Sequence, residues 1–225
     1  MEKMYQNLEY VNKLLDIQRN YKTYYAWGAI GSPANKKNRE RYKVPNAPSD
    51  SFLFDCSGFA YKALPLGWIG DKNRTYGGAD PGKDMDLFNC NDILSICDDV
   101  SSDFSRIQPG EVLYMSGHVG IYIGEGRAVE CTSNWSNGVL ISLVSNITTE
   151  SGEQKRKWLK HGKLPFVIYN KEEIAEPVYT TARIGEGLIR IARRVGISFD
   201  EIKRLNPEIK GPVYLVRLGQ KVRIK

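Results

Sequence analysis

GHVGIYIG, at residues 117–124, is the stretch that decides the fold of this chain. Apolar, β-branched and tyrosine side chains fill it, and glycines stand at both ends, as in a strand bounded by turns. Comparable runs lie on either side of it: EVLYM at 111–115, AVECT at 128–132, GVLISLV at 138–144 and LPFVIY at 164–169. This pattern predicts a meander of short antiparallel strands joined by Gly-containing turns.

The residues before Gly110 have a different texture, with helical and loop patterns. Apolar side chains near the N-terminus recur every three or four positions, which predicts an amphipathic helix over residues 3–18. They are Met4, Leu8, Val11 and Leu15. Residues 31–53 are rich in Pro, Asn, Ser and Lys, and we expect a long surface loop there. A short helix begins near Cys56 and ends before Gly67. Helices followed by strands predict an α+β domain, with helices packed on an antiparallel sheet, over residues 1–170.

Asp55-Cys56-Ser57-Gly58 opens the predicted short helix. A thiol at a helix N-terminus lies near the positive end of the helix dipole and near free N–H groups, and both favour the thiolate. The backbone N–H of Cys56 is also placed to bind an oxyanion. The sequence therefore predicts that Cys56 is a nucleophile.

The remaining cysteines have no role that the sequence assigns; they are Cys90, Cys97 and Cys131. The chain has no C-x-x-C pair and only two histidines, so we expect neither a zinc site nor another metal, and no cofactor. A disulfide framework is not expected in a chain with 41% hydrophobic residues. The second histidine, His161, stands in the basic run KHGK and is expected at the surface.

His118 begins the decisive strand, and small neighbours leave its ring accessible. A catalytic base must reach the thiol, and a third group should orient the base. If residues 124–126 form a three-residue loop, Gly120 pairs with Glu130. His118 and Glu130 then lie diagonally on one face of the hairpin, roughly 7 Å apart. A loop of two or four residues would turn Glu130 to the other face and make Asn134 the orienting residue.

Three motifs together resemble the NlpC/P60 family of cysteine peptidases: DCSGF at 55–59, PGEVL at 109–113 and GHVGIYIG at 117–124. YAWG at 25–28 resembles the tyrosine-containing motif that precedes the cysteine in that family. The resemblance covers roughly residues 20–169 and implies a papain-like α+β fold.

The same resemblance implies a role for each residue of the predicted site. The implied set is Cys56 as nucleophile, His118 as base and Glu130 as orienting residue, with Tyr25, Asp55 and Ser57 at the substrate. Glu130 stands where the family often has His. The stretch between Tyr25 and Cys56 is longer than is usual in the family, so Tyr24 is the alternative to Tyr25.

A second domain follows the first. Residues 171–177, KEEIAEP, are charged and end in Pro, so we expect a linker there. Residues 178–225 then read as strand, helix, helix and strand. In this region Ser198 and Glu201 have the spacing of a capping box, and Asn206-Pro207 ends the second helix.

This second domain resembles a LysM module. The matching segments are YTTARIGEGLIRIA at 179–192, LNP at 205–207 and LGQKVRI at 218–224. The resemblance implies a βααβ fold that binds N-acetylglucosamine-containing glycan. The residues implied at the glycan are Gly185, Glu186, Gly187, Leu188, Asn206, Pro207 and Ile209. Gly187 stands where the family commonly has Thr, which removes a helix-capping hydroxyl.

The basic charge of the chain belongs to this second domain. Residues 178–225 hold eleven Lys or Arg against four Asp or Glu, which leaves −1 of the total +6 for residues 1–177. Such a field attracts nucleic acid, anionic membranes or anionic wall polymers. No nucleic-acid motif is present, and no apolar stretch approaches the roughly 20 residues that span a membrane. We expect a monomer whose partner is peptidoglycan, bound through its stem peptide and its glycan.

Together the two resemblances imply a peptidoglycan hydrolase that cuts an amide bond in or next to the stem peptide. A γ-D-glutamyl endopeptidase and an N-acetylmuramoyl-L-alanine amidase both fit. The first twenty residues lack an apolar h-region, so no secretory signal is expected, and the protein would reach the wall after release, as a phage or prophage endolysin does. The alternatives are a bacterial autolysin, a catalytically inactive wall-binding protein, and an acyl-transfer enzyme with a substrate outside the wall.

Overall fold

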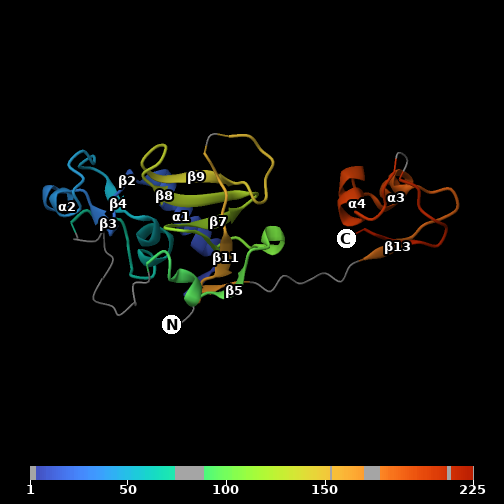
Figure 1. Ribbon diagram of the computed structural model, residues 1–225, viewed down its shortest axis with the longest axis horizontal. Coiled ribbons are helices and arrows are strands. Elements are labelled where there is room, and N and C mark those ends of the chain that lie inside the picture. The colour runs from blue at the N-terminus through green and yellow to red at the C-terminus, as the bar shows by residue number, and fades with distance from the viewer. Residues whose placement is uncertain (1–3, 74–88, 153, 170–177, 212–213, 225) are drawn as a thin grey trace. The chain divides into compact units, whose positions relative to one another are not determined.

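The chain forms two compact units, Met1–Asn170 and Lys171–Lys225, each with its own hydrophobic core (Figure 1). The computed structural model describes residues 4–73, 89–152, 154–169, 178–211 and 214–224. The linker predicted at 171–177 lies outside the described residues. None of the helices in these described ranges is long and apolar enough to cross a membrane.

A seven-stranded sheet with the order β10-β9-β8-β7-β6-β11-β5 forms the centre of the N-terminal unit (Figure 1). Its strands are β5 (Asp98–Ser101), β6 (Val112–Met115), β7 (His118–Gly124), β8 (Arg127–Thr132), β9 (Gly138–Val144), β10 (Lys155–Arg156) and β11 (Lys160–Lys163). Every neighbouring pair is antiparallel except β9 with β10. The predicted meander is confirmed as β6 to β9, and so is the α+β class. The predicted strand at 164–169 is not part of the meander, because its residues 167–168 pair in parallel with the N-terminal residues 5–6 in a separate sheet.

Two smaller sheets complete this unit. β2 (Thr23–Tyr25) and β3 (Ile30–Pro33) flank β4 (Phe52–Phe54), while β1 (Tyr5–Gln6) pairs with β12 (Val167–Ile168). The prediction of a loop over 31–53 is wrong in part, because β3, the helix α2 (Lys36–Arg41) and β4 fall within it. These strands have only three or four residues, which is too short for an alternating pattern to stand out. The remaining short helical turns are η2 (Ile93–Ser95) and η3 (Phe104–Arg106).

The N-terminal helix α1 (Asn7–Asn20) packs on the core, but on a different face from the predicted one. Its buried apolar residues are Tyr10, Val11, Leu14 and Ile17. Met4 lies before the helix, and Leu8 is 56% exposed on its outer side. The helical spacing was therefore predicted correctly. The buried face differs from the predicted one because it includes Tyr10 and Ile17, which were not among the predicted apolar residues.

His161 is buried on β11, which contradicts its expected surface position. Its Nδ1 contacts the Glu111 carboxylate, and its Nε2 lies 2.9 Å from the Asp103 carbonyl oxygen. Burial alone would lower the pKa of His161, but these two acceptors raise it above the usual value. The basic run KHGK is thus a strand of the sheet whose histidine joins β6 to the loop before η3.

The C-terminal unit has the predicted βααβ order. β13 (Tyr179–Thr181) pairs antiparallel with β14 (Lys221–Arg223), and α3 (Leu188–Val195) and α4 (Phe199–Leu205) lie between them in sequence. Ser198 Oγ accepts a hydrogen bond from the Glu201 N–H at 3.1 Å, which is the predicted cap of α4. Gly196, with φ of +76°, ends α3 in the left-handed conformation that glycine adopts without strain.

Replacement of Leu14 by Ala is expected to lower the free energy of unfolding of the N-terminal unit by about 2–5 kcal/mol, because the side chain is fully buried. Leu8→Ala, on the exposed side of the same helix, should change it by less than about 0.5 kcal/mol. Denaturant titration followed by tryptophan fluorescence measures this, since all four tryptophans lie in residues 1–170. Equal losses for the two variants would contradict the orientation of α1.

Candidate active site

Cys56 lies directly after β4, in the first turn of a short helical segment that continues as the π-helical turn η1 (Gly58–Lys62). Its side chain packs among buried apolar residues and is only 5% exposed. The predicted short helix is therefore present, and the cysteine occupies its N-terminal end.

Asp55 holds this turn in place. Its Oδ2 accepts the Gly28 N–H at 2.8 Å, and its Oδ1 accepts the Ser57 hydroxyl at 2.9 Å together with the Gly58 N–H. Asp55 and Ser57 are both buried, and these two side chains bond to each other. These bonds show that Asp55 and Ser57 shape the turn that carries Cys56, and their predicted place at the substrate stays a prediction.

Gly58 is required by a close approach of two backbone segments. A Cβ at this position would lie 2.1 Å from the Ala29 carbonyl oxygen, well inside van der Waals contact. The glycine therefore lets the nucleophile turn pack directly against the segment after β2. This gives the last residue of the DCSG motif a steric reason.

Tyr25, and not Tyr24, shares the surroundings of Cys56. Tyr25 pairs with Phe54 across β2 and β4 and packs against the apolar cluster that contains Cys56. Burial raises the pKa of the Tyr25 hydroxyl, and the nearby Cys56 and Asp55 raise it further. Tyr24 packs against a separate cluster, because successive strand residues point to opposite faces.

His118 and Glu130 are in direct contact. The Nε2 atom of His118 lies 2.6 Å from Oε2 of Glu130. The ring also stacks on Trp158, with centroids 5.7 Å apart and planes inclined by 16°. The alternative orienting residue, Asn134, is exposed in the turn between β8 and β9. A proton on Nε2, donated to Glu130, leaves Nδ1 of His118 as the free proton acceptor.

The hairpin reaches this contact by a route that differs from the predicted one. The expected three-residue loop at 124–126 is wrong, since Gly124 pairs with Arg127 and leaves a two-residue turn. A bulge in β7 just before Gly124 compensates for the missing loop residue. Gly120 therefore still faces Glu130, and a Cβ on Gly120 would lie 3.3 Å from the Glu130 Cβ.

Glu130 is fully buried and has three partners besides the backbone. In addition to His118, Ser142 Oγ donates to Oε1 at 2.5 Å, and Arg156 contacts both carboxylate oxygens. Burial alone would raise the pKa of Glu130, but the hydrogen bonds from His118, Arg156 and Ser142 lower it below its usual value. The carboxylate is thus ionised at neutral pH.

Sequence reasoning missed both of these additional partners. Arg156 stands in the basic run Lys155-Arg156-Lys157, which looks like solvated surface. Ser142 could have been found from the sequence, because it stands between Leu140 and Val144 at a position of β9 where alternation predicts a buried side chain. A hydroxyl in a buried register requires a hydrogen-bond partner, and here that partner is Glu130.

The Cys56 thiol lies against the strand that carries His118. The backbone N–H groups of Val119 and Ser57 donate hydrogen bonds to its sulfur. Burial, together with the nearby Asp55 carboxylate and the Cys90 side chain, nevertheless raises the pKa of the Cys56 thiol to about 12. Burial therefore opposes the effect of the N–H groups at the helix N-terminus, which by themselves favour the thiolate.

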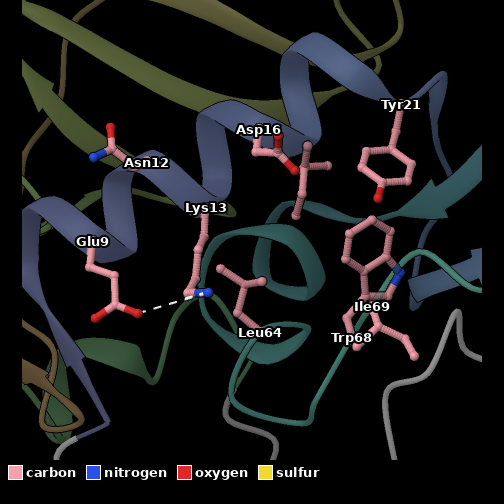
Figure 2. Close-up of a pocket in the computed structure, with 9 residues that line it drawn as sticks. Glu9, Asn12, Lys13, Asp16, Tyr21, Leu64, Trp68 and Ile69 are labelled. Carbon is pink, nitrogen blue, oxygen red and sulfur yellow. Dashed lines mark ion pairs between the residues drawn. The ribbon is translucent and has the colours of Figure 1, made fainter.

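A hollow of about 660 Å³ lies elsewhere, between the outer face of α1 and the segment at 64–69 (Figure 2). Figure 2 shows Lys13 reaching toward Glu9 on one side and the rings of Tyr21 and Trp68 on the other. No cysteine or histidine lines this hollow. The hollow therefore offers no nucleophile, although Ile17, Leu64 and Trp68 in its wall belong to the apolar cluster that contains Cys56.

In the C-terminal unit, three of the predicted glycan contacts are buried in the core: Leu188, Asn206 and Ile209. Asn206 bonds through Nδ2 to the Ile202 and Arg223 carbonyl oxygens and through Oδ1 to the Arg223 N–H. These three side chains help to hold the unit together, and the predicted contact of these residues with glycan stays a prediction. Among the others, Glu186 pairs with Arg194 at 2.7 Å, which lowers the pKa of Glu186 to about 2.

The exposed apolar residues of this unit gather near the remaining predicted contacts. Leu215 forms a bridge with Gly187 and is 75% exposed, and Ile184 and Leu218 are also exposed. Leu215 and Leu218 line a hollow of about 590 Å³ together with residues of the loop at 208–210. Gly185 and Pro207 are exposed as expected. Sequence reasoning missed the two leucines, because their exposure depends on the fold of the loop before β14.

Residues 181–225 match the family described as LysM domain, which confirms the resemblance of the second domain. The chain is also similar to three solved structures. NlpC1 from Trichomonas vaginalis is 15% identical with a TM-score of 0.38, and the match covers 70% of this chain and 43% of that chain. A P60 domain from M. avium subspecies paratuberculosis is 18% identical with a TM-score of 0.39, and the match covers 70% of this chain and 94% of that chain. The peptidoglycan hydrolase RipB from Mycobacterium tuberculosis is 17% identical with a TM-score of 0.39, and the match covers 70% of this chain and 64% of that chain. The chain therefore spans less than two thirds of NlpC1 and RipB. No curated protein matches it in sequence.

The raised pKa predicts that Cys56 reacts slowly when no substrate is bound. At pH 8 its alkylation by iodoacetamide should be at least about a hundredfold slower than that of N-acetylcysteine, because so little thiolate is present. Mass spectrometry of the peptide that contains Cys56 gives the rate. Rapid alkylation at pH 6–7 would show instead that Cys56 rests as a thiolate beside a protonated His118.

Proposed function

We propose that this chain is a bacterial cell-wall hydrolase that cleaves an amide bond in or next to the peptidoglycan stem peptide. The observation that carries the proposal is the buried His118–Glu130 pair on the strand that lies against the Cys56 thiol. A nucleophile, a base and a group that orients the base are the parts that acyl transfer requires. The LysM match at residues 181–225 supports peptidoglycan as the substrate.

In the first half of the reaction, Nδ1 of His118 removes the Cys56 proton as the sulfur attacks the amide carbonyl carbon. The new S–C bond pushes the carbonyl electrons onto oxygen, where the Cys56 backbone N–H is placed to stabilise the charge. Collapse of this intermediate breaks the C–N bond, and His118 gives its proton to the leaving amine. Glu130 stabilises the imidazolium while it exists.

In the second half, water hydrolyses the thioester. His118 takes a proton from the water as its oxygen attacks the acyl carbon, and returns it to the sulfur as the S–C bond breaks. The products are a carboxylic acid and the amine released earlier, and the resting thiol is restored. Asp55 keeps the nucleophile turn fixed through both halves, because its carboxylate ties that turn to Gly28.

Two amide bonds fit this chemistry, so the proposal covers a γ-D-glutamyl endopeptidase and an N-acetylmuramoyl-L-alanine amidase. The pairing of a catalytic unit with a wall-binding unit suits a phage or prophage endolysin that is made in the cytoplasm and acts on the wall after release. A bacterial autolysin would have the same parts. A wall-binding protein without activity is disfavoured, because the contact between His118 and Glu130 is intact.

Purified full-length protein should release peptidoglycan fragments with new amine termini, and Cys56→Ala should lower this activity by about 10⁴-fold or more. Mass spectrometry of fragments from isolated sacculi identifies the bond that is cut. Undiminished release by Cys56→Ala would remove Cys56 as nucleophile. Binding without release by either protein, on walls of several chemotypes, would favour the inactive wall-binding protein.

The second unit is tested separately by binding. Leu215→Ser, made in full-length Cys56→Ala protein, should weaken binding to sacculi roughly fivefold, since a side chain that is 75% exposed loses its contact with the glycan. Val178→Ser is the matched control, because Val178 is exposed but does not line the hollow at 208–220. Co-sedimentation with sacculi measures both. Equal binding by the two variants would place the glycan elsewhere.

A further inference from the structure

Arg156 is the charged partner of Glu130 that takes no part in the proposed reaction. Its Nε lies 3.1 Å from Oε1 and its Nη2 lies 2.8 Å from Oε2 of the carboxylate. The first contact is a hydrogen bond and the second is an ion-pair contact, so the guanidinium faces both oxygens of the carboxylate. The arginine side chain is only 12% exposed and the carboxylate is not exposed at all, so water screens the pair very little.

Two tryptophans hold the guanidinium in this position. Its central carbon lies 4.8 Å from the ring centre of Trp135 and 5.7 Å from that of Trp158. Trp158 is the same ring on which His118 stacks. The backbone of Trp135 is in the left-handed region, with φ of +57°, an uncommon conformation for a bulky residue. Arg156, Glu130 and His118 are therefore fixed as one cluster.

The charges in this cluster decide where a proton resides. A buried carboxylate alone beside an imidazole would draw a proton onto the ring and leave a thiolate on the cysteine. Here the positive charge of Arg156 balances that of Glu130, so the pair is neutral before His118 gains a proton. A neutral thiol on Cys56 is then favoured over a thiolate, in agreement with the burial of Cys56.

We propose that Arg156 is a positioning residue that acts through Glu130 to keep the resting proton on the Cys56 sulfur rather than on His118. The inference rests on the proposed function and adds to it a control of the nucleophile. The thiol stays unreactive toward oxidants and electrophiles in the free protein. It loses its proton only when a substrate carbonyl is in place to accept the sulfur.

Other groups face the two ends of this cluster, and all of them stay unchanged in the test. Around Glu130 they are His118 from β7, Ser142 from β9 and the Cys131 thiol from its own strand. Around Cys56 they are Asp55, Cys90, Tyr25, Tyr61, Lys62 and Cys131.

The test is the rate at which iodoacetamide alkylates Cys56 between pH 5 and 9 in full-length protein. Arg156→Gln should raise this rate about tenfold or more at pH 6.5, because the unbalanced carboxylate then favours the imidazolium and the thiolate. Arg156→Lys keeps the charge and should remain within about threefold of the natural protein. Circular dichroism and the alkylation of Cys131, which is fully buried, report whether each variant is folded.

A second comparison can be made even if Arg156→Gln does not fold because the Glu130 carboxylate has lost its charge partner. Glu130→Gln and the double variant Glu130→Gln, Arg156→Gln both lack that carboxylate. Removal of the arginine charge should raise Cys56 alkylation about threefold or more in the double variant relative to Glu130→Gln. A merely structural arginine would instead slow the reaction, or expose every thiol alike.

Unchanged or slower alkylation of Cys56 in folded Arg156→Gln, or equal rates in the second comparison, would overturn the inference. Arg127→Gln is the control, because Arg127 pairs with Glu150 at 3.3 Å on the surface of the same sheet and should have no effect. Alkylation requires no peptidoglycan, so the result is independent of cleavage. Loss of the proposed function would appear as a failure to cut sacculi, and loss of this inference as an unchanged alkylation rate.

Discussion

The Glu130 carboxylate is the constraint on which the catalytic arrangement depends. An ionised carboxylate with no exposure to water costs several kcal/mol unless donors surround it. Its donors come from three different strands, with His118 on β7, Ser142 on β9 and Arg156 on β10. The register of each strand must therefore be correct at once. The bulge before Gly124 sets this register, because without it the two-residue turn would point Glu130 away from His118.

Asp55 serves the nucleophile as Glu130 serves the base. Its carboxylate accepts from Gly28, Ser57 and Gly58, which locks the turn after β4 against the segment after β2. Cys56 and His118 are thus each held by a buried carboxylate that is itself saturated with donors. Such rigidity keeps reacting groups aligned, and it also explains why the resting thiol is neutral, since the site excludes the water that would stabilise a thiolate.

In the C-terminal unit, some of the residues near the predicted glycan site hold the fold together and others are exposed. Asn206 resembled a ligand contact, but its amide joins α4 to β14 and is buried. Leu215 and Leu218 are exposed in the hollow that they share with residues 208–210 and are available to a ligand. In the proposed hydrolase, a wall-binding surface on the same chain would raise the effective concentration of substrate for the N-terminal unit, whose hollow at α1 contains no cysteine or histidine.

The sequence by itself determined the helices α1, α3 and α4, the β6 to β9 meander, the βααβ order and the candidates Cys56, His118 and Glu130, but not α2, because periodicity and motif spacing are local properties. It did not determine the short strands around 23–54, the buried state of His161 or the pairing of Arg156 with Glu130. Those depend on contacts between residues far apart in sequence, where a basic run such as KRK has the same pattern whether it meets water or a buried carboxylate. Only the tertiary structure decided which of these basic residues faces inward, and with it the neutral charge of the catalytic cluster.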